Sequence, residues 1–213
     1  MSDRKPQLWP PSRRSGSVIR PLPFEGDDSA LVRGIVAGHP GAVATFHQRY
    51  ASHVQSILLR ILGVDQELAD VHHDVFVRAL QSMRSLRDPE ALKAWLTSVA
   101  VLTAKTWIQR RQRHRWLRFL PVEELPEREA PMVPGEVREA FHATYQALAE
   151  LPADERVAFS LRIIDGMEVA EVARSCRVSL STIKRRLAKA ELHFRKSARK
   201  YPVLEEWLSG DPK

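Results

Sequence analysis

The stretch EVAEVARSCRVSLSTIKRRLAKAELHF, residues Glu168 to Phe194, has the pattern of two helices joined by a tight turn. A short apolar stripe from Val169 to Ala173 is interrupted around Cys176, and Ser179 is placed to cap a second helix through its hydroxyl. Apolar residues then recur three and four positions apart, as on one face of an α-helix, at Leu180, Ile183, Leu187, Ala190 and Phe194. The stretch therefore predicts a helix-turn-helix.

The other face of the second predicted helix is basic, and no acidic residue occurs between Ser179 and Ala190. A helix-turn-helix places its second helix in the major groove of DNA, where cationic side chains meet phosphates and base edges. The alternative is an ordinary helical hairpin with a solvated basic face. The residues expected to face outward are Thr182, Lys184, Arg185, Arg186 and Lys189.

Composition favours a globular protein with a polyanionic partner. The 213 residues are 44% hydrophobic and carry a net charge of +7, with a pI near 9.9. No apolar run reaches the ~18 residues of a membrane span. A single cysteine, Cys176, excludes an internal disulfide and indicates a reducing cytoplasm. Its place in the predicted turn favours a buried structural thiol over a reactive one.

Prolines and charge divide the chain into segments, and the predicted fold class is all-α with two small helical domains. Residues 1–27 read as a disordered, basic, proline-rich arm, and residues 119–135 as an acidic, proline-rich, flexible linker. The helical domains are expected at 28–118 and 136–200, followed by a tail at 201–213.

Apolar periodicity predicts four helices in the first domain, beginning near Leu31, Val43, Leu68 and the cap-and-first-turn pair Asp88-Pro89. Two further helices are expected in the second domain before the helix-turn-helix. Their predicted inward residues are Val137, Phe141, Tyr145 and Leu148 in the first, and Val157, Leu161 and Ile164 in the second.

The end of the fourth predicted helix is strongly basic. No acid occurs from Thr97 to Val122, and Trp107 and Trp116 are interleaved with the cations Lys105, Arg110, Arg111, Arg113, Arg115 and Arg118. Cations bind phosphates, and indole rings stack on bases or guanidinium groups. We therefore expect nucleic-acid binding here, with a merely solvated charge run as the alternative.

The sequence gives little support to a metal site or to catalysis. His72 and His73, flanked by Asp70 and Asp74, are adjacent, whereas zinc-binding histidines on a helix usually lie four apart. No phosphate-cradling glycine loop or nucleophile elbow occurs. We predict no metal, no cofactor and no enzymatic activity.

Three motifs resemble a bacterial RNA polymerase sigma factor of the extracytoplasmic-function (ECF) type in the sigma-70 family. DVHHDVFVRAL, Asp70 to Leu80, is similar to region 2.2, and LKAWLTSVA, Leu92 to Ala100, to region 2.3. LPADERVAFSLRIIDGMEVAEVARSCRVSLSTIKRRLAKAELHFR, Leu151 to Arg195, is similar to region 4. The likeness spans roughly residues 28–200.

The resemblance implies that the protein binds RNA polymerase core, melts the −10 promoter element and reads the −35 element, with an anti-sigma factor as a further partner. It implies core binding by Asp70, Asp74, Phe76 and Arg78. It implies −10 DNA binding by Met83, Arg84, Ser85, Arg87, Lys105, Trp107, Arg110, Arg111 and Arg113. It implies −35 DNA binding by Ser179, Ser181, Thr182, Lys184, Arg185, Arg186 and Lys189.

The sequence departs from the family pattern at a few positions. Val101 and Leu102 stand where an Arg-Asn pair is usual, and Arg177 occupies a turn position where glycine is usual, which predicts backbone strain. Two rival functions stay open. One is a helix-turn-helix regulator that binds duplex operator DNA without polymerase core, and the other is a helical adaptor that binds no nucleic acid.

Overall fold

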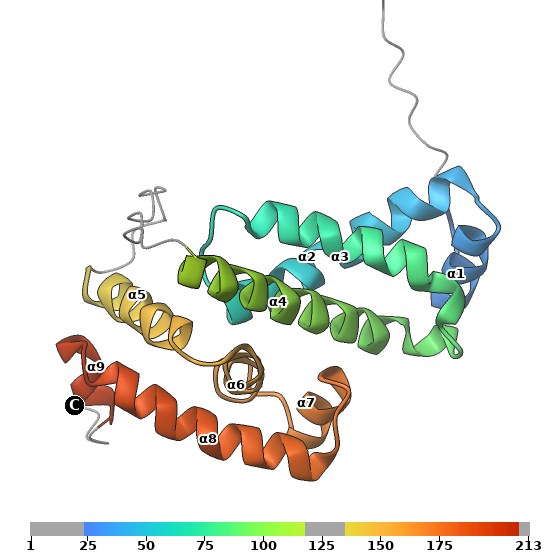
Figure 1. Cartoon of the computed structure of the whole chain (residues 1–213). Helices are drawn as coiled ribbons and strands as arrows, with labels where there is room; N and C mark the ends of the chain where they lie inside the picture. Colours follow the sequence, from blue (N-terminus) through green and yellow to red (C-terminus); the bar gives the residue numbers. More distant parts are fainter. Residues whose placement is uncertain (1–23, 118–134, 209–213) are drawn as a thin grey trace, which may run out of the picture.

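A computed structural model describes residues 24–117 and 135–208, and these residues form helices and turns with no strand (Figure 1). The first module contains α1 (Asp28–Val36), α2 (Pro40–Leu62), α3 (Leu68–Ser82), the short 3-10 turns η1 (Met83–Ser85) and η2 (Pro89–Ala91), and α4 (Leu92–Leu117). The second contains α5 (Gly135–Ala149), α6 (Ala153–Phe159), the π-turn η3 (Ser160–Ile164), α7 (Val169–Ser175), α8 (Leu180–Ala198) and α9 (Pro202–Leu208). This architecture confirms the all-α prediction.

Local sequence signals explain where the helices of the first module begin and end. Asp27 caps α1 by accepting from the Ala30 amide at 2.7 Å, and Asp88 accepts from the Glu90 amide at 3.0 Å where η2 leads into α4. Gly63 ends α2 at a φ of 77°. Fully buried side chains from α1, α2 and α4 fill the core between the helices, among them Leu31, Phe46, Ile57, Leu58, Ile61, Leu92, Leu96 and Ile108.

The predicted boundary of the N-terminal arm lies too far along the chain. Phe24 packs against the core and contacts the ring of His39 edge-on, with ring centroids 5.3 Å apart. Since Asp27 also caps α1, residues 24–27 belong with the first module. The rest of the predicted arm, the predicted linker up to residue 134 and the tail beyond residue 208 lie outside the described residues.

The second module corrects part of the predicted burial. Val137 and Phe141 are 56% and 42% exposed, because α5 turns Ala143, Ala147 and Leu148 inward instead. Ile164 is also partly exposed, since the π-turn at η3 adds a residue to the turn and changes which side chains face the core. Val157 and Leu161 are buried as predicted.

The helix-turn-helix forms as predicted, with α7 and α8 as its two helices. Ser179 caps α8, its Oγ accepting from the Thr182 amide at 3.2 Å. Arg177 in the turn has a φ of 52°, the strained conformation expected where glycine is usual. Leu180, predicted inward, is 46% exposed because it begins the helix before the apolar face reaches the core at Ile183.

The two modules pack against one another. Figure 1 shows α6 nearly end-on between α4 and α8. One continuous hydrophobic cluster joins Leu96 and Ile108 of the first module to Val157 and Ile183 of the second. The apolar surfaces of α4, α6 and α7 thus cover one another.

Candidate nucleic-acid and polymerase interfaces

The outward face of α8 carries an array of donors suited to DNA. Ile183, Leu187 and Ala190 are buried beneath it, which turns the residues between them to solvent. The exposed members of the predicted −35 set are Ser179, Ser181, Lys184, Arg185 and Lys189. Three of these, Ser181, Lys184 and Arg185, lie in the first two turns of α8, where the side chains of a recognition helix reach base edges.

Several members of the predicted −35 set make intramolecular contacts. Ser179 serves as the helix cap, and its Oγ lies 2.8 Å from the Thr182 hydroxyl. Arg186 is half-buried and its guanidinium forms an ion pair with Asp154 at 3.2 Å. Arg186 therefore faces α6 rather than the open surface beside Lys184 and Arg185.

The predicted −10 set falls into two separate groups. Arg84, Ser85 and Arg87 lie before the start of α4, whereas Arg110 and Arg113 lie near its other end. A helix rises 1.5 Å per residue, so the two groups are roughly 27 Å apart along α4. They are exposed at opposite ends of the helix, and one melted base cannot contact both.

Several predicted −10 residues near the end of α4 are already partnered inside the first module. The indole of Trp107 donates to Glu67 at 2.9 Å, and the guanidinium of Arg111 lies 5.0 Å from the Trp107 ring centroid. Arg111 also forms an ion pair with Asp65. These acids come from the connection between α2 and α3, and they neutralise part of the basic helix.

Burial removes two predicted site residues from the surface. Met83 is 1% exposed and belongs to the core, although it was expected to contact −10 DNA. Phe76 is 5% exposed and packs edge-on against Phe46, with ring centroids 5.3 Å apart, although it was expected to contact the polymerase. Both are apolar residues that complete the packing around α3, and this outweighs the role that their motif position suggested.

The remaining predicted core-binding residues share an exposed face of α3. Asp70, Asp74 and Arg78 recur every four residues, so they lie one above another along the helix, and all three are exposed. Val101, at a position of departure from the family pattern, is buried and 1% exposed. It therefore serves the core rather than a DNA surface.

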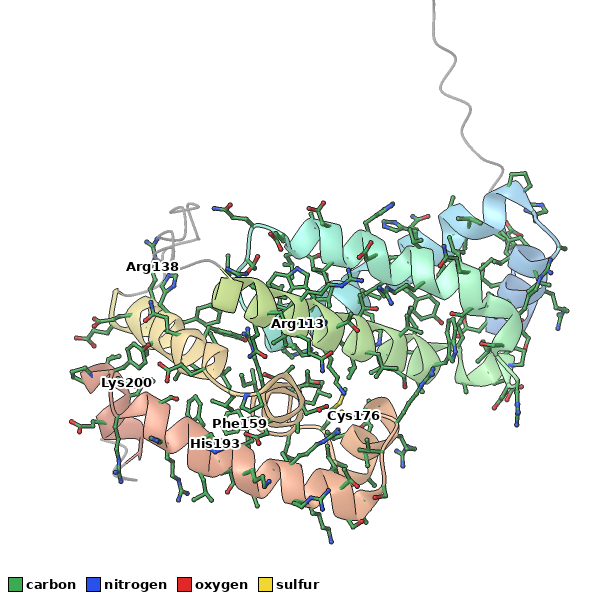
Figure 2. All side chains as sticks on the ribbon, viewed as in Figure 1. Arg113, Arg138, Phe159, Cys176, His193 and Lys200 are labelled. Carbon is green, nitrogen blue, oxygen red and sulfur yellow. The ribbon has the colours of Figure 1, made fainter. Side chains whose placement is uncertain are left out.

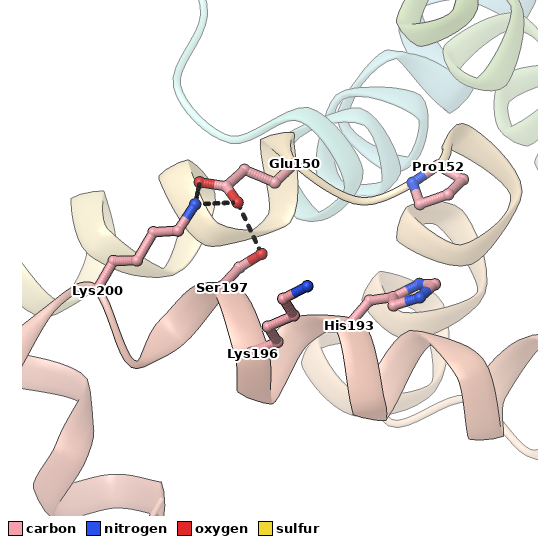
Figure 3. Close-up of a pocket in the computed structure, with 6 residues that line it drawn as sticks. All are labelled: Glu150, Pro152, His193, Lys196, Ser197 and Lys200. Atoms are coloured by element: carbon pink, nitrogen blue, oxygen red, sulfur yellow. Dashed lines mark hydrogen bonds and ion pairs between the residues drawn. The ribbon is translucent and has the colours of Figure 1, made fainter.

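An ion pair and a hydrogen bond to Glu150 lie beside the cavity at the α5–α6 connection. The cavity has a volume of about 300 Å³, and it lies between Pro152, Glu150 and the last turns of α8 (Figure 3). Glu150 accepts from Lys200 at 2.7 Å and from the Ser197 hydroxyl at 2.9 Å. Within residues 24–117 and 135–208, no group of three or more metal-ligating side chains comes together.

Cys176 is buried at the turn, on the side that faces α4 (Figure 2). Burial raises the pKa of its thiol to about 11, so the thiol is neutral at physiological pH. The environment is that of a structural cysteine.

Models of two protein families match the chain in the order of the two modules. Sigma-70 region 2 matches residues 46–114, and Sigma-70 region 4 matches residues 141–194, together more than half of the chain. The chain belongs to the sigma-70 family. It is a sigma factor for transcription initiation.

Relatives place this sigma factor in the ECF type. It is 24% identical to the RNA polymerase sigma-H factor of Pseudomonas aeruginosa over 193 residues, covering 84% of the chain and 96% of that relative. It is 26% identical to the ECF RNA polymerase sigma-E factor of Escherichia coli K12 over 175 residues. This match covers 76% of the chain and 90% of that relative.

Solved structures share the fold of this sigma factor. CnrH in complex with the cytosolic domain of CnrY has a TM-score of 0.52 at 20% identity, over 79% of this chain and 95% of CnrH. RpoE in complex with the anti-sigma factor NepR from Bartonella quintana has a TM-score of 0.53 at 20% identity. This match covers 72% of this chain and 96% of RpoE. Among the described residues of this sigma factor, no helix is sufficiently long and apolar to cross a membrane.

Sequence reasoning did not find the residues that join the two modules of this sigma factor. Asp154, Arg156 and Tyr145 contact the first module, yet none was expected to do so from its place in the sequence. A basic residue in an apolar helical stripe, as Arg156 is beside Val157, is the one signal that the sequence offers. This signal does not indicate which groups accept hydrogen bonds from the Arg156 guanidinium.

Proposed function

We propose that this sigma factor binds RNA polymerase core through α3, opens the −10 element with its first module and reads the −35 element with α8. The observation that carries the proposal is the exposed donor array on α8, backed by a buried apolar face and capped by Ser179. The exposed stripe of Asp70, Asp74 and Arg78 supports a polymerase contact on a separate face. Its place of action would be the cytoplasm, where the polymerase works.

An anti-sigma factor is proposed as a regulatory partner. Support comes from two structural neighbours, one bound to the cytosolic domain of CnrY and the other to the anti-sigma factor NepR. The proposed linker at 119–135 would connect the modules while they contact distant parts of the polymerase and promoter.

Reconstitution with purified polymerase core tests this function. The wild-type protein should co-purify with core and initiate transcription at a restricted set of promoters. Asp74→Ala should weaken core binding about tenfold, since a charged residue at an interface hot spot is typically worth more than about 1 kcal/mol. Glu90→Ala, an exposed acid at the other end of the module, is the matched control.

A regulator that acts without core predicts a different result. Core binding would be undetectable at micromolar concentration, while the folded protein would bind duplex DNA. That outcome would replace the sigma function with operator binding.

A further inference from the structure

One short turn of the chain, residues 65–67 between α2 and α3, holds two side chains of α4. The indole Nε1 of Trp107 donates to the carboxylate of Glu67 at 2.9 Å. The guanidinium of Arg111 forms an ion pair with the carboxylate of Asp65. Trp107 and Arg111 are four residues apart, so they are neighbours on one face of α4. A single turn therefore restrains both members of the pair.

Asp65 is built into this turn and is not a loose surface acid. Its side chain is only 10% exposed. Its Oδ1 accepts from the Glu67 amide at 2.9 Å, and its Oδ2 is the oxygen that pairs with Arg111. Because both carboxylate oxygens are engaged, the carboxylate cannot rotate away from Arg111 without breaking a hydrogen bond to the backbone. The ion pair is thus anchored at the start of α3.

Trp107 and Arg111 are layered on the surface of the first module. The indole of Trp107 packs against the hydrophobic core. The guanidinium carbon of Arg111 lies over the indole, 5.0 Å from the ring centroid, which is within the range of a cation–π contact. The Arg111 side chain is 49% exposed. The indole therefore supports the guanidinium from the protein side, and the guanidinium remains accessible from solvent.

The contacts of Arg111 suit a nucleobase better than a phosphate. A phosphate is bound by the N–H edge of a guanidinium, often through two parallel hydrogen bonds. Nη1 of Arg111 is already bound to Asp65, whose charge offsets that of the arginine. A base instead needs a flat face, and bases stack on guanidinium planes as they do on aromatic rings. Arg110, the preceding residue, is exposed and forms no ion pair within the described part of the chain, so it is the better phosphate ligand.

A base that stacks on Arg111 has to be unpaired. In duplex DNA the two faces of a base are covered by its neighbours, and a protein that uses such a face first takes the base out of the stack. A fixed, flat, cationic surface at the end of α4 therefore favours an opened strand over a closed duplex.

We propose that Trp107 and Arg111 form a stacking platform for one unpaired nucleobase, and that Asp65 and Glu67 are the positioning residues that hold this platform in place. The proposal rests on the proposed function and deepens it, because it assigns a base of the opened strand to this end of α4. Neither acid belongs to the DNA-binding set expected from the sequence. Their role follows from their contacts with Trp107 and Arg111.

The platform is tested by binding the full-length protein to two single strands of equal charge. One is a strand of about twelve thymidines, whose bases stack little on one another, and the other is an abasic strand with the same sugar-phosphate backbone. The base preference is the ratio of the two affinities. The wild-type protein should prefer the thymidine strand roughly tenfold, as expected for one base stacked on a protein side chain.

Arg111→Lys separates the flat surface of the arginine from its charge. Lysine retains the positive charge and can pair with Asp65, but it has no planar group on which a base can stack. The base preference should therefore disappear, while the slope of log affinity against log salt stays unchanged.

Asp65→Asn tests the positioning role. The asparagine oxygen can still accept from the Glu67 amide, but the ion pair that holds Arg111 is lost. The base preference should fall about threefold. The affinity for the abasic strand should rise, because a negative charge near the backbone is removed. A purely electrostatic effect of Asp65 would instead raise the affinity for both strands by the same factor.

The ion pair between Arg49 and Asp28 supplies matched controls in the same module. Its atoms Nη1 and Oδ1 are 2.8 Å apart, and the two side chains are 35% and 28% exposed. Neither Arg49→Lys nor Asp28→Asn should change the base preference. A 2-aminopurine placed within the thymidine strand reports stacking directly through the loss of its fluorescence. This loss should occur with the wild type and with Arg49→Lys, and should be absent with Arg111→Lys.

The platform is overturned if the wild-type protein binds the two strands equally, or if Arg111→Lys keeps the base preference. An equal gain of affinity on both strands with Asp65→Asn also overturns the positioning role. If the base preference is absent while the protein still initiates transcription with polymerase core, the platform fails and the sigma function stands. If the variants behave as expected but no form binds core, the platform stands as a single-strand site and the proposed sigma function fails.

Discussion

The ring of Tyr145 lies against Gly63 so closely that a Cβ on Gly63 would come within 2.7 Å of ring atom Cδ1. Gly63 ends α2 with a φ of 77°, so this residue meets two requirements at once. It allows the chain to leave the helix in a conformation that other residues rarely adopt, and it makes room for a ring from the second module.

Gly63→Ala should lower the free energy of unfolding by about 2–4 kcal/mol, because backbone strain and overpacking against Tyr145 add together. Gly38→Ala is the matched control, since Gly38 has a φ of 78° but no atom within 4 Å of the place that a methyl group would take. Gly38→Ala should lower the free energy of unfolding by about 1–2 kcal/mol through backbone strain alone. Urea denaturation measures both, and equal losses would show that the Tyr145 contact is unimportant.

Arg185→Ala should weaken −35 recognition in a sequence-dependent manner. Arg185 is exposed early in α8, where a base-contacting side chain is worth ~1–3 kcal/mol of discrimination. Binding of the holoenzyme to matched and −35-scrambled promoters measures the effect. Arg195→Ala, an exposed arginine near the other end of the same helix, serves as the control. An equal loss of affinity on both promoters would mean that α8 does not read bases at Arg185.

Arg110→Ala should lower affinity on many sequences alike. The exposed Arg110 lies on the basic end of α4, and a lost phosphate contact reduces the slope of log affinity against log salt by roughly 0.7–0.9. Promoter opening should slow more on a closed duplex than on a pre-melted bubble. Arg33→Ala on α1 is an exposed basic control. An unchanged salt slope would identify this end of α4 as a solvated face.

Cys176 should react slowly with alkylating reagents at pH 8. Burial raises the pKa of the thiol from 9.0 to about 11, so its thiolate fraction falls about a hundredfold relative to an unshifted thiol. Because the folded pKa is the higher one, this contribution to stability is complete below about pH 9 and is lost as the pH rises through about 11. Alkylation should accelerate in urea, and equal rates in folded and unfolded protein would contradict burial.

The periodic spacing of apolar residues and the capping residues at helix ends determined most of the secondary structure. The apolar spacing from Ile183 to Ala190 produced the buried face of α8, and Ser179 capped it as its hydroxyl predicts. Such signals are local, because a cap or an amphipathic stripe involves residues within one or two turns. Runs of basic residues are also local features, so the sequence identified the basic surfaces of α4 and α8 as candidate DNA sites.

Tertiary packing decided which of these residues remain at the surface. Met83 and Phe76 fit surface roles in their motifs, but the space around α3 required apolar side chains and buried both. Lys105 and Arg186 became partners of one carboxylate because α6 packs between α4 and α8. Asp154 is far from Lys105 along the chain and meets it only through folding, and no local pattern encodes such a pairing.

The sequence by itself therefore determined the helices, their caps and the family of the protein, since each depends on spacing along the chain. The junction of the modules was decided by the tertiary structure alone. The carbonyl of Leu59 accepts from the Gly63 amide, whereas the last three carbonyls of α2, at residues 60–62, accept from Tyr145 and Arg156, which lie more than 80 residues away. The sequence shows where a helix ends and therefore which carbonyls lack a partner within the helix. Only the packing of the second module determines which side chains pair with them.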